Sequence, residues 1–394
     1  MRNLSGFEGV YVSDRRELNT WLPDTNGQFP YGQGVITISF LNGLLIFSPN
    51  GGTIEFINHT PQYFSTARLP YNYDKGARCP RWEAFLDDVM QADTQRSELL
   101  QEWAGYMLTD SLRFQKFMLL AGEGGNGKTV FTTLIEKMVG LENVSHIPLS
   151  LFGDKFSLAS TLGKMLNSTS ESSHGINELC ETALKSYTSG DRMTFERKYR
   201  EPISAHPTAK IMISTNQLPN FADKSNGVWR RLLFVPFDRC IPADEQDPHL
   251  IDELSAELPG IFNWAYRGLL KLLADGQFIE PRRCKMALAE YRRDTNPARV
   301  FLEENYTEGF EFEGIPCGEV YHAYVAWCSQ NGYRPLNANN FGKEVKRTFN
   351  SITRKQTRQY GRQAWVYEGL ITKDGSEVAT GALTTGVTNG TKDF

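Results

Sequence analysis

The sequence lacks the patterns that mark disulfide-stabilised, zinc-binding and membrane-spanning proteins. Its six cysteines are dispersed and form no C-x-x-C pair, so neither a zinc site nor a disulfide framework is indicated, and a reducing compartment is favoured. The longest apolar stretches, such as residues 44–47, are far too short to cross a bilayer. The N-terminus also lacks the charged-then-apolar pattern of a signal peptide. We therefore expect a cytoplasmic protein that does not act in a membrane.

A strong excess of one charge is missing as well. The chain has 42 Lys and Arg against 46 Asp and Glu, so its net charge of −4 does not favour nucleic-acid binding, and any contact with DNA must come from local basic patches. With 394 residues, of which 40% are hydrophobic and 22% charged, the composition is that of a globular protein of two or three domains.

What the sequence does contain is a glycine-rich loop of high specificity. It reads Gly122-Glu-Gly-Gly-Asn-Gly127-Lys128-Thr129 and matches the phosphate-loop pattern G-x-x-x-x-G-K-[ST] at every position. Residues 117–121 before it read as a buried strand, and residues 130–139 after it have helical periodicity. A strand, a glycine loop and a helix N-terminus together cradle a polyphosphate, because backbone N–H groups converge on the anion and the helix dipole attracts it.

ATP and Mg²⁺ are the ligands that this loop predicts. In a phosphate loop the lysine, here Lys128, reaches the β- and γ-phosphates, and the hydroxyl of the next residue, Thr129, holds Mg²⁺. The residues expected to bind the nucleotide are Gly122, Glu123, Gly124, Gly125, Asn126, Gly127, Lys128 and Thr129. A chance glycine loop is the alternative, and the strand and helix on either side argue against it.

Phosphoryl transfer also needs an acid near the attacking water and Mg²⁺, and a sensor of the γ-phosphate. Residues 162–171 are typical of a strand that delivers Glu171, which either polarises the water or helps to hold Mg²⁺. The alternative is a solvated glutamate in a Ser-rich loop. Asn216, at the end of another predicted strand, is either a sensor of the γ-phosphate or a turn-forming residue before Pro219.

A positive charge that stabilises the transition state is the third requirement. Arg230 and Arg231 directly precede a strand predicted at residues 232–237. An arginine at this place either completes the site of a neighbouring subunit or forms surface ion pairs, and the local sequence leaves both interpretations open.

The pattern of strands and helices divides the chain into six regions. They are a mixed β region at 1–75, a helical unit at 76–111, a core at 112–240, a helical subdomain at 241–296, a C-terminal module at 297–371 and a disordered tail at 372–394. Strand-like and helix-like segments alternate in the core, which favours an α/β fold with a mainly parallel sheet. In the C-terminal module helices are followed by a strand, an order that suits a winged helix-turn-helix.

The C-terminal module also contains the most basic stretch of this net-acidic chain. Residues 343–362 contain one acid, Glu344, and seven cations: Lys343, Lys346, Arg347, Arg354, Lys355, Arg358 and Arg362. Tyr360 and Trp365 lie among or beside them. A winged helix with such a patch is a natural contact for duplex DNA, and a merely solvated basic face is the alternative.

Several short stretches in a fixed order match one known family. They are Phe40-Leu-Asn-Gly43, Leu69-Pro-Tyr-Asn-Tyr-Asp74, Cys79-Pro-Arg-Trp-Glu-Ala-Phe-Leu86, the glycine loop, Leu184-Lys-Ser-Tyr-Thr-Ser-Gly-Asp191, Ser214-Thr-Asn216 with Pro219, and Val228-Trp-Arg-Arg231 with Val235-Pro-Phe237. Over roughly residues 35–371 the chain therefore resembles the superfamily 3 helicases, which are AAA+ ring motors, and specifically the helicase half of phage- and plasmid-type primase-helicases.

This resemblance implies an AAA+ core over 112–240, a helical oligomerisation unit over 76–111 and assembly into a homo-oligomeric ring, expected to be a hexamer. It implies that Lys128 and Thr129 form the family's phosphate-loop pair and that Glu171 lies at its second acidic motif. Lys185, Gly190 and Asp191 would then belong to an intermediate motif. Asn216 would be the polar sensor, and Arg231 would be the family's most regular arginine. In such a ring we expect Arg231 to act across a subunit boundary, with Arg230 as the alternative.

The family also builds a β-hairpin between Asp191 and the sensor strand, and this hairpin lines the pore of the ring. The corresponding segment here holds Arg197, Lys198 and Arg200. Three cations on a protruding hairpin are suited to follow the backbone of single-stranded DNA without reading its sequence. An ordinary solvated basic turn is the alternative.

Two departures from the family bear on function. The acidic strand is polar, and no second carboxylate lies immediately beside Glu171. Many relatives carry a primase domain upstream, whereas this chain begins directly at the segment before the helical unit, so priming is expected to come from a separately encoded primase as partner or from residues outside this sequence.

Three functions are open on the sequence alone. The first is an ATP-dependent DNA helicase that unwinds DNA during replication of a phage, prophage, satellite or plasmid. The second is an ATP-gated replication initiator or regulator that binds DNA and unwinds little. The third, an interaction module with a decayed site, is disfavoured by the intact Lys128–Thr129 pair.

Overall fold

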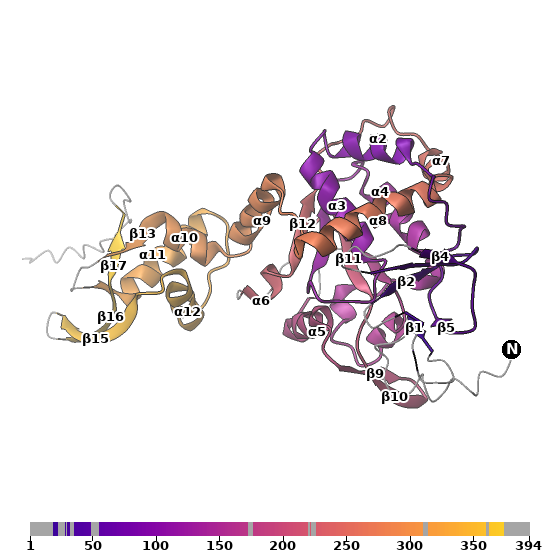
Figure 1. The fold of residues 1–394 in the computed structure, drawn as a ribbon. Coiled ribbons are helices and arrows are strands. Elements are labelled where there is room, and N and C mark those ends of the chain that lie inside the picture. Colours follow the sequence, from indigo (N-terminus) through magenta and orange to yellow (C-terminus); the bar gives the residue numbers. More distant parts are fainter. Residues whose placement is uncertain are drawn as a thin grey trace, which may run out of the picture. The chain divides into compact units, whose positions relative to one another are not determined.

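The computed structural model of the chain describes residues 19–22, 28, 30–31, 35–48, 55–171, 176–219, 221, 226–309, 314–359 and 362–373. For Asn19, Thr20, Glu171, Asn226, Arg358, Gln359 and Arg362 it describes the backbone alone. The chain divides into two compact units, Met1–Ala289 and Glu290–Phe394 (Figure 1). The division falls within helix α9 (Arg282–Asp294), whereas the sequence places a boundary at 296/297, just after this helix.

A five-stranded parallel sheet forms the centre of the first unit. Its strands are β6 (Phe117–Ala121), β7 (Val144–Ser145), β8 (Leu166–Glu171), β11 (Lys210–Thr215) and β12 (Leu232–Pro236), in the order β12-β6-β11-β8-β7. Strands β6 and β12 are buried along their whole length, which is why they read as continuous apolar runs. The predicted α/β class with a mainly parallel sheet is confirmed.

Strand β8 is unusually polar for a buried strand, and its buried amide is fully bonded. Asn167 accepts hydrogen bonds from the Ser145 hydroxyl and the Ile147 N–H, both at 2.9 Å, and donates to the Ile147 carbonyl at 2.9 Å. Because its polar atoms are paired, Asn167 lies inside the sheet without an unsatisfied group. The amide of Asn167 therefore ties β8 to β7 and to the residue that lies two positions after β7.

Helices from distant parts of the sequence share one core with the sheet. They are α2 (Pro80–Val89), α3 (Thr94–Tyr106), α4 (Lys128–Val139), α7 (Leu250–Ser255) and α8 (Leu258–Asp275). The first unit also contains α5 (Glu178–Ser189), α6 (Asn226–Trp229) and the short 3₁₀ helices η1 (Leu141–Asn143), η2 (Leu149–Leu151) and η3 (Ser157–Thr161).

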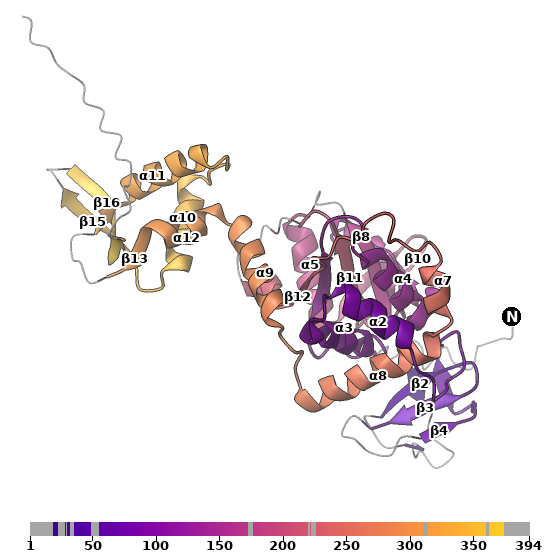
Figure 2. The ribbon, with the colours of Figure 1, turned by 90° about the horizontal axis from the view of Figure 1, so that it is seen from above.

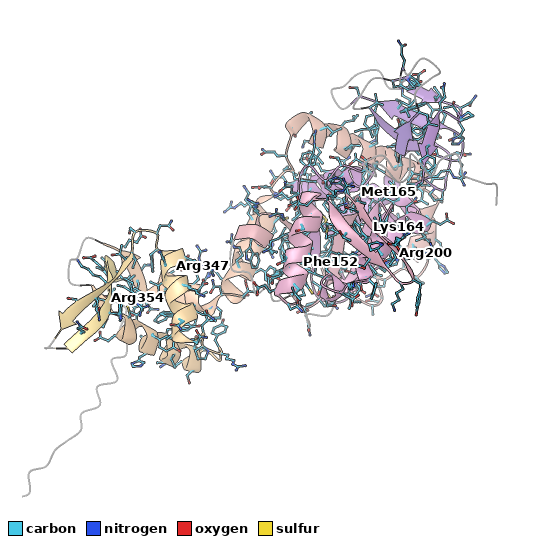
Figure 3. All side chains as sticks on the ribbon, turned by 90° about the horizontal axis from the view of Figure 1, so that it is seen from below. Phe152, Lys164, Met165, Arg200, Arg347 and Arg354 are labelled. Carbon is cyan, nitrogen blue, oxygen red and sulfur yellow. The ribbon has the colours of Figure 1, made fainter. Side chains whose placement is uncertain are left out.

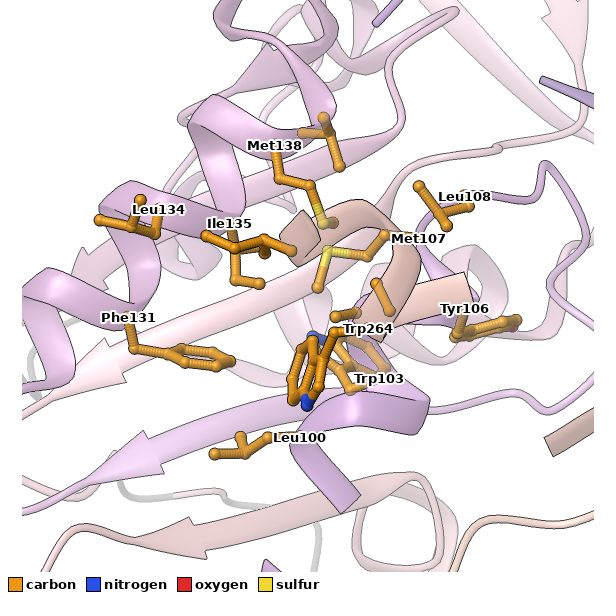
Figure 4. Close-up of a cluster of buried hydrophobic side chains, with 14 of the residues drawn as sticks. Leu100, Trp103, Tyr106, Met107, Leu108, Phe131, Leu134, Ile135, Met138 and Trp264 are labelled. Atoms are coloured by element: carbon orange, nitrogen blue, oxygen red, sulfur yellow. The ribbon is translucent and has the colours of Figure 1, made fainter. Parts of the chain in front are cut away.

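Aromatic side chains form the centre of this shared core. Trp82 of α2 stacks on Phe131 of α4 at 5.7 Å and meets the edge of Trp264 of α8 at 5.5 Å. Figure 4 shows side chains of α3, α4 and α8 meeting here, among them Trp103 and Met138. The two helical segments that the sequence suggests as separate regions thus pack together on the helix that follows the phosphate loop.

Two small antiparallel sheets precede α2. Strands β2 (Ile36–Ser39), β3 (Leu44–Phe47) and β4 (Glu55–Ile57) form one, and β1 (Asn19–Trp21) pairs with β5 (Tyr63–Ser65) in the other. The first sheet packs on α8, because the Phe40 and Phe262 rings lie 4.7 Å apart and the Phe47 and Tyr266 rings 4.9 Å apart (Figure 2).

A β-hairpin extends outward from the first unit between α5 and β11 (Figure 1). Its strands are β9 (Met193–Arg197) and β10 (Arg200–Ala205), and Arg200 pairs with Arg197 across a two-residue turn. The predicted hairpin segment between Asp191 and the sensor strand therefore forms a hairpin.

The second unit contains helices α10 (Pro297–Asn305), α11 (Cys317–Gln330) and α12 (Ala338–Thr348) and two small antiparallel sheets. One sheet has the order β14 (Ile315–Pro316), β16 (Arg362–Glu368), β15 (Thr353–Gln359), and the other pairs β13 (Tyr306–Glu308) with β17 (Leu370–Thr372). The stacked rings of Tyr324 and Phe341, 4.5 Å apart, join α11 to α12. Thr372 still belongs to β17, and the rest of the predicted tail, from residue 374, lies outside the described residues.

Throughout the part of the chain that is described, every helix is too short or too polar to cross a bilayer.

Candidate functional site

The phosphate loop joins β6 to α4, as the sequence predicts. Gly127 directly precedes α4 with φ +85°, and a Cβ there would lie 2.7 Å from the Val89 Cγ1 atom of α2. Gly122 has φ +156°, and a Cβ there would overlap the Asn126 amide. Both positions therefore need glycine, for the backbone conformation and for the close approach of neighbouring atoms.

Asn126 fixes the loop to the strand beside it. Its side chain is 3% exposed, and Nδ2 donates a hydrogen bond of 3.1 Å to the carbonyl of Phe237, which follows β12. Its Oδ1 accepts a bond of 2.9 Å from the ammonium of Lys128. The sequence includes Asn126 only as one of the variable positions of the motif, and nothing in the pattern indicates this double role.

The Lys128 ammonium is held entirely by oxygens of its own loop. Besides Asn126 Oδ1, it donates to the Gly122 carbonyl at 2.7 Å and the Glu123 carbonyl at 2.8 Å. The residue is 4% exposed, and burial lowers the pKa of Lys128 below its ordinary value. An ammonium with three neutral oxygen partners keeps its charge available to an anion that enters the loop.

A cavity of about 1110 Å³ opens beside the loop. Lys128 and Thr129 line it together with Ser170 of β8, Thr215 of β11 and Asn216. These residues lie at the carboxyl ends of parallel strands, where open α/β sheets bind their ligands. The volume is at the upper end of the roughly 300–1,000 Å³ of small-molecule sites, enough for a nucleotide.

The other wall of the cavity comes from segments that the sequence analysis did not assign to the site. Arg81, Phe85 and Asp88 of α2 face it, together with Arg239 and the segment at 241–250. Arg239 forms ion pairs with Asp88 and, at 3.1 Å, with Glu245. These residues lie far from the motif in the sequence and reach the cavity through tertiary contacts: α2 packs on the loop, and the Ile241 N–H donates to the Gly125 carbonyl at 2.7 Å.

The candidate acid and sensor lie on neighbouring strands. Glu171 is the last residue of β8 and pairs in register with Thr215, so its backbone lies at the same edge of the sheet as Asn216. The side chain of Glu171 lies outside the described residues. Asn216 is exposed and lines the cavity. The fold thus places both predicted positions at the mouth of the phosphate loop.

Mg²⁺ fits this edge as an ion held chiefly by a ligand's phosphates. The exposed Thr129 side chain lines the cavity, and the described residues contain no group of three or more His, Cys, Asp and Glu that could enclose a metal ion. Mg²⁺ usually keeps several waters and binds through one or two protein groups and substrate phosphates. A hydroxyl beside a phosphate loop satisfies that requirement.

The two candidate arginines have different surroundings. Arg231 is 7% exposed, and its guanidinium donates to the Gly227 carbonyl and to the Ser189 hydroxyl, both at 2.7 Å. Burial lowers the pKa of Arg231, and the neighbouring Arg230 lowers it further. Arg230 is exposed, and among the described residues its one hydrogen-bond contact is through its backbone carbonyl, to the Lys116 ammonium at 2.7 Å. Arg231 therefore links β12 to the end of α5 within its own chain, while Arg230 faces solvent.

The candidate DNA contacts lie on two separate elements. On the hairpin, Lys198 and Arg200 are exposed at the turn, and Arg197 donates to the Glu201 carbonyl at 2.8 and 3.1 Å (Figure 3 labels Arg200). Tyr199, which the sequence analysis did not assign, is fully exposed between these cations, with φ +58°. The sequence does contain a signal for Tyr199, because it is an aromatic residue between a Lys and an Arg at a turn.

In the second unit the predicted basic residues do not share one environment. Lys343, Lys346 and Arg347 lie on α12, and Arg354 and Lys355 on β15. Arg358 is also on β15, with its side chain outside the described residues.

Three families match separate parts of the chain. Residues 35–91 match the family D5 N terminal like, residues 120–231 a family of unknown function (DUF5906), and residues 295–374 the RFX DNA-binding domain. The first match covers the N-terminal strands and α2, the second the phosphate loop to Arg231, and the third the second unit.

Curated relatives and a solved structure were also found. "Putative helicase 022R" of Frog virus 3 is 25% identical over 53% of this chain and 24% of its own length, and "Putative helicase L207/L206" of Acanthamoeba polyphaga mimivirus is 26% identical over 63% and 28%. The chain thus spans about a quarter of these viral relatives. "Transcription factor RFX4" of Mus musculus is 34% identical over 21% of this chain and 11% of its own. The structure titled "The A form apo structure of NrS-1 C terminal region-CTR" covers 86% of this chain and 97% of that chain, at 12% identity and a TM-score of 0.47.

Proposed function

We propose that this chain is an ATP-driven, ring-forming DNA helicase of the superfamily 3 type. It has an AAA+ core and a C-terminal winged-helix domain, and it acts in the replication of a phage, prophage, satellite or plasmid. The observation that carries the proposal is the loop at 122–129, whose buried Lys128 lies beside a nucleotide-sized cavity at the carboxyl edge of a parallel sheet. Similarity to two viral proteins named as helicases supports unwinding among the uses of ATP.

The residues of the loop have defined roles in this proposal. The backbone N–H groups of the loop and the Lys128 ammonium hold the β- and γ-phosphates, and Thr129 holds Mg²⁺. When bound, Mg²⁺ neutralises phosphate charge and orients the γ-phosphate. Asn126 keeps Lys128 at the loop before the phosphates arrive, through the 2.9 Å bond from the ammonium to its Oδ1.

The strand ends supply the groups that act on water. Asn216 hydrogen-bonds the γ-phosphate or the attacking water from the end of β11. Glu171, one strand further along the sheet, polarises that water. Glu171 ends β8 and Asn216 directly follows β11, so the sheet sets the distance between their backbones.

DNA contact is divided between two elements in this proposal. The hairpin cations Arg197, Lys198 and Arg200 bind the backbone of a single strand, and Tyr199 stacks on a base. The C-terminal unit binds duplex DNA, which agrees in kind with its match to the RFX DNA-binding domain. The same match favours a second candidate function, an ATP-gated DNA-binding initiator or regulator with little unwinding.

Phosphate release tests the proposal directly. The Lys128→Ala chain should lose DNA-stimulated hydrolysis, because no other side chain of the loop supplies a positive charge to the phosphates. Turnover is measured with saturating single-stranded DNA, and unchanged turnover would remove the assignment. A strand-displacement assay on forked DNA with ATP then separates the two candidates: a helicase separates the strands, and a regulator hydrolyses ATP without doing so.

A further inference from the structure

We propose that the C-terminal unit binds the phosphodiester backbone of duplex DNA in a single cleft, through Lys343, Lys346 and Arg354, and that the adjacent Arg347 and Lys355 do not contact it. The inference rests on the DNA binding proposed above and specifies where it occurs. In the sequence these five cations form one basic stretch, and only their partners in the structure distinguish them.

The cleft has a volume of about 1280 Å³ and lies where α11, α12 and the β15–β16 pair meet. Lys343 and Lys346 line it from α12, and Arg354 and Trp365 from the strands. One carboxylate, that of Glu319, lines it as well, so the cations of the cleft outnumber its acids. A concave, positive surface of this kind concentrates field lines and attracts a polyanion.

Two of the five cations are already neutralised by acids of the same unit. Arg347 donates to Glu344 at 2.6 Å, and the Glu344 side chain is buried and also accepts from Asn296 at 3.0 Å. Lys355 donates to Glu368 at 3.2 Å, and this ion pair lowers the pKa of the Glu368 carboxyl. A phosphate that bound either cation would have to displace a carboxylate, which removes most of the electrostatic gain.

The three cations of the cleft, unlike Arg347 and Lys355, are not paired with a carboxylate of the described residues. Among the described residues, no carboxylate forms an ion pair with Lys343, Lys346 or Arg354. The Arg354 guanidinium lies 4.7 Å from the centre of the Trp365 ring, and this ring is 46% exposed. An indole ring holds a guanidinium in place over its face. The N–H donors lie in the plane of the guanidinium itself and stay available to a phosphate.

The local geometry explains why neighbours in sequence have different roles. Arg354 and Lys355 are successive residues of β15, so their side chains leave opposite faces of the sheet. Lys346 and Arg347 are successive residues of α12, about 100° apart around the helix axis, and Arg347 turns back to Glu344 one turn earlier. Figure 3 labels Arg347 on the helix and Arg354 on the strand.

Two charge-matched double variants of the full chain test the inference. Lys346→Gln with Arg354→Gln removes two cations of the cleft, and Arg347→Gln with Lys355→Gln removes two paired cations, while glutamine keeps a donor for Glu344 and Glu368. Duplex binding is measured by filter binding over a salt series. The cleft variant should lose about tenfold in affinity, and its slope of log K against log salt should fall by about 1.8, since each phosphate contact contributes about 0.9. The paired variant should stay within about twofold of the parental chain, with an unchanged slope.

The outcomes separate this inference from the proposal on which it rests. Equal losses in the two variants would overturn the cleft and show that binding follows overall charge. A parental chain without affinity for duplex DNA would overturn both the inference and the proposed duplex contact. Thermal unfolding, expected to be unchanged in both variants, verifies that each chain is folded. A Lys343→Gln variant, expected to weaken binding while melting normally, confirms the cleft from a third position, and parental affinity there would contradict it.

Discussion

At the scale of single residues, Lys128 shows how the oxygens of the phosphate loop hold an ammonium group in place. Its ammonium has three oxygen partners within the loop, one of them the side chain of Asn126. Neutral oxygens hold an ammonium in place without cancelling its charge, whereas a carboxylate at the same distance would compete with the phosphates. An amide at position 126 therefore suits a loop that must release its lysine to an incoming anion.

Glu102 of α3 is a buried residue that should make the free energy of unfolding depend on pH. Its carboxylate accepts a hydrogen bond of 2.8 Å from the Ile279 N–H, and burial raises the pKa of Glu102 from its ordinary value of 4.5 to about 7. Between these two values the folded chain keeps a proton that the unfolded chain has lost. The free energy of unfolding therefore falls as the pH rises through this window.

The Glu102→Gln variant should lack this contribution. The difference in free energy of unfolding, variant minus parental chain, should increase from about pH 4.5 to about pH 7 and then level off. Urea denaturation of both chains at several pH values measures the difference. A difference that does not change with pH would mean that Glu102 is ionised in the folded chain throughout.

At the scale of elements, the β9–β10 hairpin combines exposure with backbone strain. Its turn places Tyr199 at φ +58°, a conformation that tyrosine adopts at a loss of about 1–2 kcal/mol relative to its preferred regions. The ring is fully exposed, so packing does not repay this strain. A strained and exposed aromatic residue beside Lys198 and Arg200 suits the proposed stacking of the ring on a DNA base.

Tyr199→Gly should therefore separate stability from DNA binding. Glycine relieves the strain, so the free energy of unfolding should be equal or up to about 1 kcal/mol higher. Affinity for single-stranded DNA should fall by at least about fivefold, because base stacking on an aromatic residue contributes about 1–3 kcal/mol. Tyr199→Phe is the matched control and should bind as the parental chain does. Normal binding by the glycine variant would exclude stacking.

At the scale of the whole molecule, a ring needs a charge that reaches into the site of the next subunit. The sequence favours Arg231 for this role, and that role stays a prediction. Arg231 is engaged inside its own chain by Gly227 and Ser189, whereas Arg230 is exposed. The surroundings of the two residues make Arg230 the better candidate for the trans contact and Arg231 a link between α5 and β12.

The two substitutions should have different effects. Arg231→Ala should lower the free energy of unfolding by about 1–3 kcal/mol, since it removes two partly buried hydrogen bonds of a side chain that is itself buried. Arg230→Ala should melt normally and lose turnover by about 10³-fold or more, and mixing it with Lys128→Ala subunits should restore part of it, since a mixed ring contains intact composite sites. If verified mixed rings show no recovery, Arg230 does not act in trans. Normal melting of Arg231→Ala would contradict its role as an internal link.

Much of the molecule could be predicted from the sequence, because local patterns carry it. The motif at 122–129 fixes a strand, a loop and a helix by short-range geometry, and alternation of apolar segments gives the parallel sheet. Asn216 and the backbone of Glu171 lie at the predicted edge, because carboxyl ends of parallel strands share one side.

The tertiary structure decided what depends on partners from distant parts of the chain. The α2 wall of the cavity, the bond from Asn126 to Phe237 and the burial of Arg231 arise from contacts between segments far apart in sequence. A charge count cannot distinguish Lys346 from Arg347, because the difference lies in whether a carboxylate is already within hydrogen-bond distance. The sequence by itself determined which chemistry the chain can carry, since residue types and spacing set it locally. Packing decided which of the similar residues are available to perform it, because burial and pairing consume the others.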